Sequence, residues 1–181
     1  YLYPHQAPNL MSQIMKLFKT SLLAIVLLFT VASCSKDDSI TLDEADYTIN
    51  LNLAHETNWE LADEILVLVN EHRSSLDLPI IERDQQYASA YAVQHTNYMI
   101  DLNRINHDNF GERSEALKQN GAIRVGENVA NGYETAEAVV FAWLNSPTHK
   151  HVIEGNYTHS GFGIIPNENG SYFFTQLFYS K

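Results

Sequence analysis

The sequence predicts an α+β domain in which helices cover a small antiparallel sheet. Apolar residues first recur at helical spacing, and two apolar and aromatic runs with strand character then end the chain. Strands and helices do not alternate as they would in a parallel sheet. With 181 residues, 45% hydrophobic and 18% charged, the chain has room for one globular domain of ordinary size plus a leader or tail.

Five helices are expected, each from apolar periodicity or from a start or stop signal. Thr57-Asn58-Trp59-Glu60 has the pattern of a capping box, which opens the first helix. The second helix has the most regular apolar stripe, and Ser146-Pro147 is a typical start for the last one. The expected ranges are about 57–73, 84–102, 114–120, 135–145 and 147–154.

Three strands are expected. Residues 122–130 form a short apolar strand, and residues 159–165 and 171–179 form a hairpin closed by a turn that ends in Asn169-Gly170.

The first third of the chain predicts export and a lipid anchor. Residues 1–14 carry no pattern and are interpreted as an upstream extension, whereas residues 15–33 have the three zones of a signal peptide. Val31-Ala32-Ser33-Cys34 resembles the lipobox of bacterial lipoproteins, in which the cysteine is lipidated; the alternative is a plain secretory signal. Residues 34–56 then form the lipidated cysteine and an acidic tether, and the domain covers residues 57–181.

Ser35-Lys36-Asp37-Asp38 resembles the surface-export signal of Bacteroidetes lipoproteins, although an ordinary polar linker would have the same composition. The expected location is therefore extracytoplasmic, on the outer membrane through the lipid anchor. Display on the cell surface is the further expectation if this segment acts as an export signal.

Charge and cysteine content exclude several classes of function. The formal net charge is -11 and no Lys/Arg cluster offsets it, so binding to nucleic acid is not expected. Cys34 is the only cysteine, which excludes an internal disulfide and a CxxC metal site.

A candidate site follows from polar residues in unexpected places. Glu127 lies inside an apolar strand, where a carboxylate needs a charge, a metal or a donor. His159 shares a strand face with Gly161 and Gly163, which predicts a shallow trough that a ligand could enter. The alternative is that these glycines admit a packed helix and that the histidine caps the end of a strand.

Two histidines and Glu127 together make a candidate metal site. His107 stands in a loop where no core periodicity explains it, and two imidazoles with one carboxylate are the ligands of an open zinc site. We therefore expect a divalent cation, with zinc as the candidate, held by His107, Glu127 and His159. His95 lies on a buried helix stripe and is better explained as a hydrogen-bonded core histidine.

Seven sequence blocks follow one another between about residues 61 and 180. They are "LVNEHRSSLDLPII", "AYAVQHTNYM", "NHDNF", "GENVANG", "AEAVVFAWLNSPTHKHVI", "HSGFGI" and "FFTQLF". In this order they resemble the SCP domain of the CAP superfamily, with its bacterial branch as the best match. This superfamily includes cysteine-rich secretory proteins, antigen 5 and pathogenesis-related proteins.

The resemblance implies a three-layer α-β-α sandwich with a central cleft lined by two histidines and two acids. It assigns His107 and His159 as the histidines and Glu127 as one acid. The position of the second acid holds Ser146, which puts chemistry copied from eukaryotic members in doubt. His149 occupies a histidine position of the bacterial branch and is expected to line the cleft instead.

Three functions are compatible with these observations. The first is a binding module that holds a divalent cation and a small-molecule, lipid or polymer ligand, with His149, Gly161 and Gly163 lining the cleft. The second is a hydrolase of cell-envelope or extracellular polymers, with Glu127 as general base; Asp108 and Glu112 are the nearby candidates for a second carboxylate. The third is an adhesive surface domain.

Overall fold

The computed structural model describes residues 47–181. The predicted upstream extension, signal peptide, lipidated Cys34 and export signal lie outside the described residues, as does most of the predicted tether. Among residues 47–181, no helix has both the length and the apolar character that a bilayer span requires.

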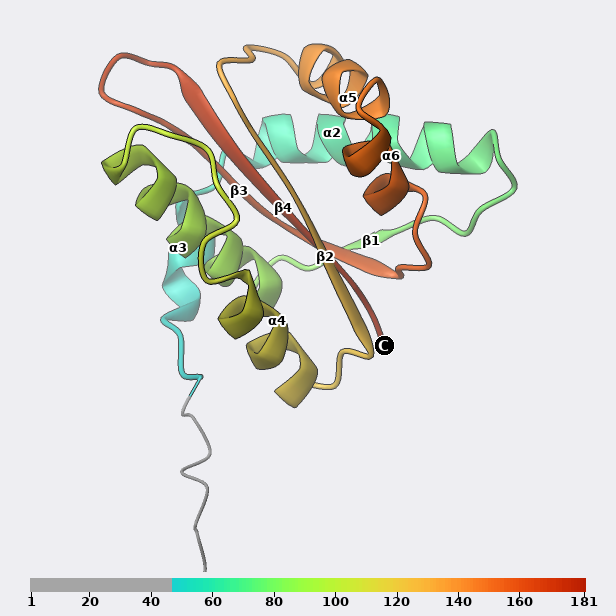
Figure 1. The fold of residues 1–181 in the computed structure, drawn as a ribbon, viewed down its shortest axis with the longest axis horizontal. Coiled ribbons are helices and arrows are strands. Elements are labelled where there is room, and N and C mark those ends of the chain that lie inside the picture. Colours follow the sequence, from blue (N-terminus) through green and yellow to red (C-terminus); the bar gives the residue numbers. More distant parts are fainter. Residues whose placement is uncertain (1–46) are drawn as a thin grey trace, which may run out of the picture. The chain divides into compact units, whose positions relative to one another are not determined.

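A four-stranded sheet forms the middle of the domain (Figure 1). Its order is β1-β3-β4-β2, and the hairpin β3–β4 and the pair β2–β4 are antiparallel. The short β1 runs parallel to β3 and was not expected from the sequence, because two residues are too few to show a strand pattern. The strands are β1 (Glu82–Arg83), β2 (Arg124–Asn131), β3 (His159–Pro166) and β4 (Tyr172–Ser180).

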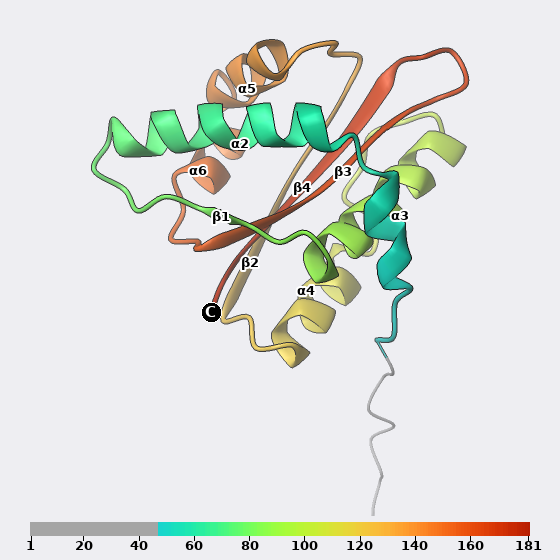
Figure 2. The same ribbon diagram turned by 180° about the vertical axis from the view of Figure 1, so that it is seen from behind.

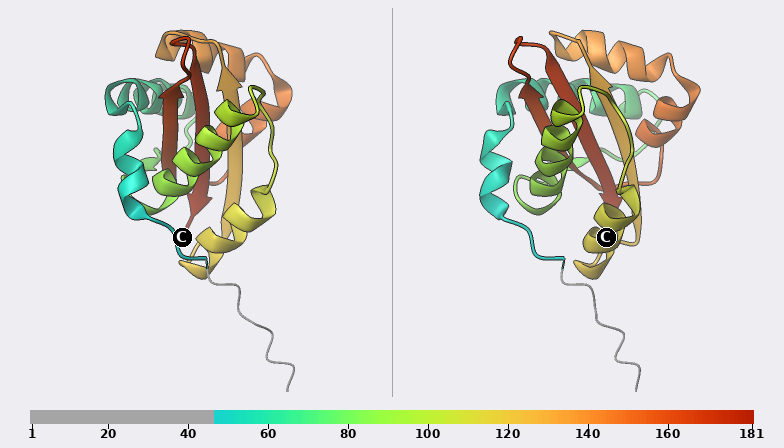
Figure 3. Two further views of the ribbon diagram at one scale, coloured as in Figure 1. Left: turned by 90° about the vertical axis from the view of Figure 1, so that its left-hand side faces the viewer. Right: turned by 60° about the vertical axis from the view of Figure 1, so that its left-hand side comes forward.

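Helices cover both faces of the sheet, so the domain has three layers (Figures 2 and 3). The predicted fold class, α+β with an α-β-α arrangement, is confirmed. One face carries α2 (Trp59–Ser74), α5 (Ala136–Leu144) and α6 (Pro147–Ile153). The other carries α3 (Tyr87–Asp101) and α4 (Phe110–Gln119), and the 3-10 helix η1 (Leu51–Glu56) lies against α3.

Alternation along the strands assigns each side chain to one of these faces. Phe174 and Phe178 of β4 pack with Trp143 of α5 in the core under α2, α5 and α6. Leu177 packs instead under α3 and α4. Glu127 is the register partner of Leu177, so its side chain also lies on the α3–α4 face of the sheet.

Several boundaries differ from the sequence prediction, and three of them change how a segment packs. Asn58, not Thr57, is the N-cap of α2, and Thr57 instead donates a hydrogen bond to the carbonyl of Phe162. Helix α4 starts at Phe110, four residues before the predicted Ser114. The predicted tether also extends too far, because residues 51–56 form η1, which buries Ala54 in the domain.

Candidate functional site

Glu127 lies in the middle of β2 and is buried. Its side chain is only 1% exposed, although it carries a carboxylate. Strand alternation directs it toward α3 and α4, since Leu177 opposite it packs in that layer. Such a group is stable in the folded chain only with a charged partner or several donors.

Arg113 of α4 is that partner. Its Nε donates to Oε2 of Glu127 at 2.9 Å and its Nη2 donates to Oε1 at 2.9 Å, which makes a two-point ion pair. Nη1 donates to the carbonyl of Asp108 at 2.7 Å, so each of the three guanidinium nitrogens has an acceptor. Burial lowers the pKa of Arg113, and the charge of Glu127 acts in the opposite direction.

His107 contacts the same carboxylate from the loop before α4. Its Nδ1 lies 2.8 Å from Oε1 of Glu127, and its side chain is 52% exposed. Since the carboxylate paired with Arg113 is an acceptor, Nδ1 carries the proton and donates it. In the neutral form of the ring the lone pair is then on Nε2, the atom that can accept a hydrogen bond or bind a metal.

His95 of α3 completes the cluster as a core histidine, as predicted. Its Nε2 donates to the carbonyl of Asn106 at 2.8 Å and lies 4.0 Å from Oε1 of Glu127. Burial is the main cause that lowers the pKa of His95, and the nearby Arg113 adds to this. The neutral ring thus holds the loop that positions His107.

His149 of α6 lines a separate cavity of about 250 Å³ together with Ile105 and Trp143. Its backbone carbonyl accepts a hydrogen bond from Nδ2 of Asn128 at 3.2 Å, which ties α6 to β2. Burial lowers the pKa of His149, and the charge of His107 lowers it further. The two histidines therefore interact electrostatically on this side of the domain.

The structure does not bring His159 to Glu127, so the predicted three-ligand arrangement is wrong. Strand β4 lies between their strands, and the two residues belong to different rows: His159 pairs with Tyr179, and Glu127 with Leu177. The imidazole of His159 stacks on Tyr179 at 5.0 Å and contacts Oγ1 of Thr158 at 2.7 Å. Within residues 47–181, no group of three or more His, Cys, Asp or Glu side chains could hold a metal ion.

Gly161 and Gly163 do not line a cleft, which corrects the predicted trough. A Cβ on Gly161 would lie 2.4 Å from the backbone of Ala88, and one on Gly163 would lie 2.4 Å from the backbone of Ala92. These two glycines admit α3 against the sheet. The alternative considered from the sequence, a packed helix over the glycines, is the one that forms.

The surroundings of Glu127 do not suit a general base. Its two oxygens accept hydrogen bonds from Arg113 and His107, and water has almost no access to a carboxylate that is 1% exposed. Asp108, a candidate second carboxylate, accepts from Tyr98 and Arg104. Nothing in the described part of the chain supports the hydrolase interpretation, and His107 is the more accessible base.

Arg113 is the site residue that the sequence analysis missed. The expected helix began at Ser114, directly after it, so no role was assigned to Arg113. The signal was its spacing: Arg113, Ala116 and Leu117 make the buried stripe of α4, and a cation on such a stripe indicates a buried anion. The sequence also showed a carboxylate, Glu127, inside an apolar strand and without a partner. The buried cation and the buried carboxylate pair with each other.

Comparison with known proteins agrees with this fold and its motifs. The model of the cysteine-rich secretory protein (CAP) family matches residues 66–178, which is more than half of the chain. The chain belongs to the CAP family. The predicted membership is thus confirmed, and Glu127 and His107 lie within the matched range.

Two proteins of Bacillus subtilis (strain 168) are similar in sequence to this CAP domain. The uncharacterized protein YkwD is 32% identical over 123 residues, covering 65% of this chain and 46% of its own length. The uncharacterized membrane protein YlbC is 33% identical over 106 residues, covering 56% of this chain and 30% of its own length. This chain therefore matches less than half the length of either relative.

Two solved structures are also similar. An outer surface protein from Borrelia burgdorferi has a TM-score of 0.60 and 25% identity, covering 67% of this chain and 93% of that protein. An extracellular protein containing an SCP domain, from Bacillus anthracis str. Ames, has a TM-score of 0.57 and 29% identity. That match covers 69% of this chain and 41% of the other.

Proposed function

We propose that this CAP domain is an extracytoplasmic binding module that holds a small or extended ligand beside His107 and His149. The supporting observation is the state of His107, whose Nδ1 is held by the buried pair of Glu127 and Arg113 while half of its side chain remains exposed. A side chain held by a buried ion pair loses little rotamer freedom on binding, so it is preorganised for a ligand.

The location is part of the same proposal. The Val31–Cys34 block supports a lipid anchor in the outer membrane. Two similar solved proteins are an outer surface protein and an extracellular protein, which agrees with export. The anchor would place the binding site on the outer side of a membrane without any need for a spanning helix.

We further propose that the ligand set for a divalent cation is the pair His107 and His149 in place of the triad expected from the sequence. Carboxylates commonly orient metal-binding histidines through the second ring nitrogen, and Glu127 holds His107 in that way. Catalytic zinc sites use three protein ligands, so two nitrogens fit only a weaker site whose other positions belong to water or to the bound ligand.

Isothermal titration with zinc chloride tests the cation. The chain from Ser35 onward should give one saturable site at neutral pH, and His107→Ala should abolish it because it removes the preorganised ligand. His159→Ala is the matched control, since His159 lies on another strand, and it should bind zinc as the parent does. If no saturable heat is measured, or if His107→Ala binds zinc as tightly as the parent, the proposed cation site is wrong.

A further inference from the structure

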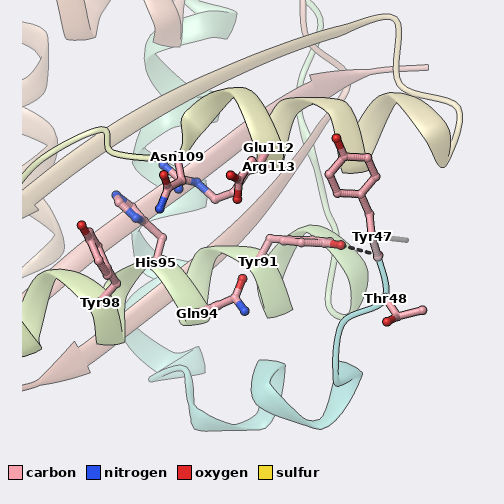
Figure 4. Close-up of a pocket in the computed structure, with 9 residues that line it drawn as sticks. All are labelled: Tyr47, Thr48, Tyr91, Gln94, His95, Tyr98, Asn109, Glu112 and Arg113. Carbon is pink, nitrogen blue, oxygen red and sulfur yellow. Dashed lines mark hydrogen bonds between the residues drawn. The ribbon is translucent and has the colours of Figure 1, made fainter. Parts of the chain in front are cut away.

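A second hollow, distinct from the cavity beside His149, lies between α3 and α4. It has a volume of about 380 Å³, within the range of small-molecule sites, and residues 47–48 close one end (Figure 4). We call it the α3–α4 groove. Its wall on α3 is made by residues spaced three and four apart on one helix face: Tyr91, Gln94, His95 and Tyr98.

No unpaired positive charge faces the α3–α4 groove. Arg113 lines it, but each of its guanidinium nitrogens already donates to Glu127 or to the carbonyl of Asp108. His95 is neutral, because burial lowers its pKa. The exposed Glu112 adds a negative charge. The groove is therefore unsuited to phosphate, carboxylate or other anionic ligands.

Two tyrosine rings are fixed along the groove. The hydroxyl of Tyr98 donates to Asp108, and its ring stacks on His95 at 6.0 Å. The hydroxyl of Tyr91 donates to the carbonyl of Tyr47 at 2.6 Å. Seven residues along a helix separate the two tyrosines by about 10 Å. Tyr91 is only 6% exposed, so Tyr98, which is 36% exposed, is the ring that can stack on a ligand. A ring that is already immobilised can bind a ligand without much further loss of rotamer entropy.

Neutral amides accompany these rings. Gln94 is exposed at the groove. Asn109 is the N-cap residue of α4 in the left-handed conformation, with φ of 58°, yet its side chain makes no capping hydrogen bond. Asn109 lines the groove (Figure 4), so its side-chain amide can form hydrogen bonds with a ligand instead. Amides supply both donors and acceptors without charge.

We propose that the α3–α4 groove is a second binding site and that its ligand is a neutral saccharide chain. Sugar rings present apolar C–H faces that stack on aromatic rings, and their hydroxyls require uncharged donors and acceptors. The groove offers both kinds of group: Tyr98 supplies an exposed ring, and Gln94 and Asn109 supply neutral amides. The groove shares His95 and Arg113 with the cluster that holds His107, but it does not depend on the proposed cation.

Titration followed by amide NMR tests the groove. Chitotriose and cellotetraose are added to the nitrogen-15-labelled chain from Ser35 onward, in parallel with a galacturonic acid trimer and a neutral Gly/Ser hexapeptide. At least one neutral saccharide should give saturable shifts in residues 91–98 and 109–113, and the acidic trimer should give weaker ones. Tyr98→Ala should weaken saccharide binding about tenfold, because it removes a stacking ring.

Two variants control this experiment. Tyr98→Phe keeps the ring and should retain binding. Phe141→Ala removes an aromatic that is 71% exposed on α5, in the other helical layer, and should have no effect. Failure of both neutral saccharides to saturate, tighter binding of the hexapeptide or the acidic trimer, or unchanged binding by Tyr98→Ala would overturn the proposal.

Discussion

Two regions of the same sheet face, β2 at Glu127 and β3 at Gly161 and Gly163, depart from an ordinary strand sequence in opposite ways. At Glu127 a charged side chain stands where apolar ones are expected, and the folded chain surrounds it with Arg113, His107 and His95. At the glycines side chains are missing, and the backbone of α3 fills the space. Of these two regions, the first holds the candidate functional side chains.

The difference follows from what each anomaly costs. A buried carboxylate is strongly unfavourable without donors, so its partners must exist somewhere in the chain and the anomaly indicates a real cluster. A glycine in a strand only leaves space, and a helix fills that space as readily as a ligand does. Unexpected charge is therefore the stronger evidence for a site.

Arg113→Met should have the largest effect on this comparison. It leaves Glu127 buried with its main cation removed, which typically lowers the free energy of unfolding by about 3–5 kcal/mol. Arg83→Met is the matched control, because Arg83 pairs with Asp63 at the surface and such pairs contribute about 0–1 kcal/mol. Urea denaturation measures both, and equal losses would mean that the buried pair has no special weight.

Gly163→Ala should have the next largest effect. Its Cβ would overlap the backbone of Ala92, which cannot move aside as a flexible side chain can, so a loss of about 1–3 kcal/mol is expected. Gly111→Ala in α4 has open space around the new Cβ and should be neutral or stabilising by about 0.5–1 kcal/mol. Thermal unfolding compares the two variants. If Gly163→Ala were as stable as the parent, the space beside Gly163 would be open, as the sequence analysis expected.

The smallest expected effect is a pH dependence that comes from the charged cluster. Burial lowers the pKa of His95 below its ordinary value of 6.5, so between the two pKa values the unfolded state binds a proton that the folded state does not. The free energy of unfolding should therefore decrease as the pH falls below about 6.5. Arg113, Glu127 and His107 face this ring and set its response.

His95→Gln should make this decrease shallower, and His149, whose pKa is also lowered, should account for part of what remains. Urea denaturation at a series of pH values between about 7 and 5 provides the measurement. An identical slope in the variant would show that His95 is not the group responsible.

Much of the architecture could be predicted from local patterns. The most regular apolar stripe predicted α3, and Ser146-Pro147 predicted the start of α6. The two final apolar runs predicted the β3–β4 hairpin. The site was predicted in part: His107 and Glu127 do meet, whereas His159 belongs to a row of residues two positions away. Strand order and register are set by contacts distant in sequence, which periodicity does not encode.

The sequence by itself determined the fold class, the burial of Glu127 and the core role of His95, because alternation and helical spacing state which positions are covered. Only the tertiary structure decided which groups cover them. It selected Arg113 as the partner of Glu127 and α3 as the occupant of the glycine face. The physical reason is that burial is a property of one position, whereas pairing depends on how two distant segments are placed together.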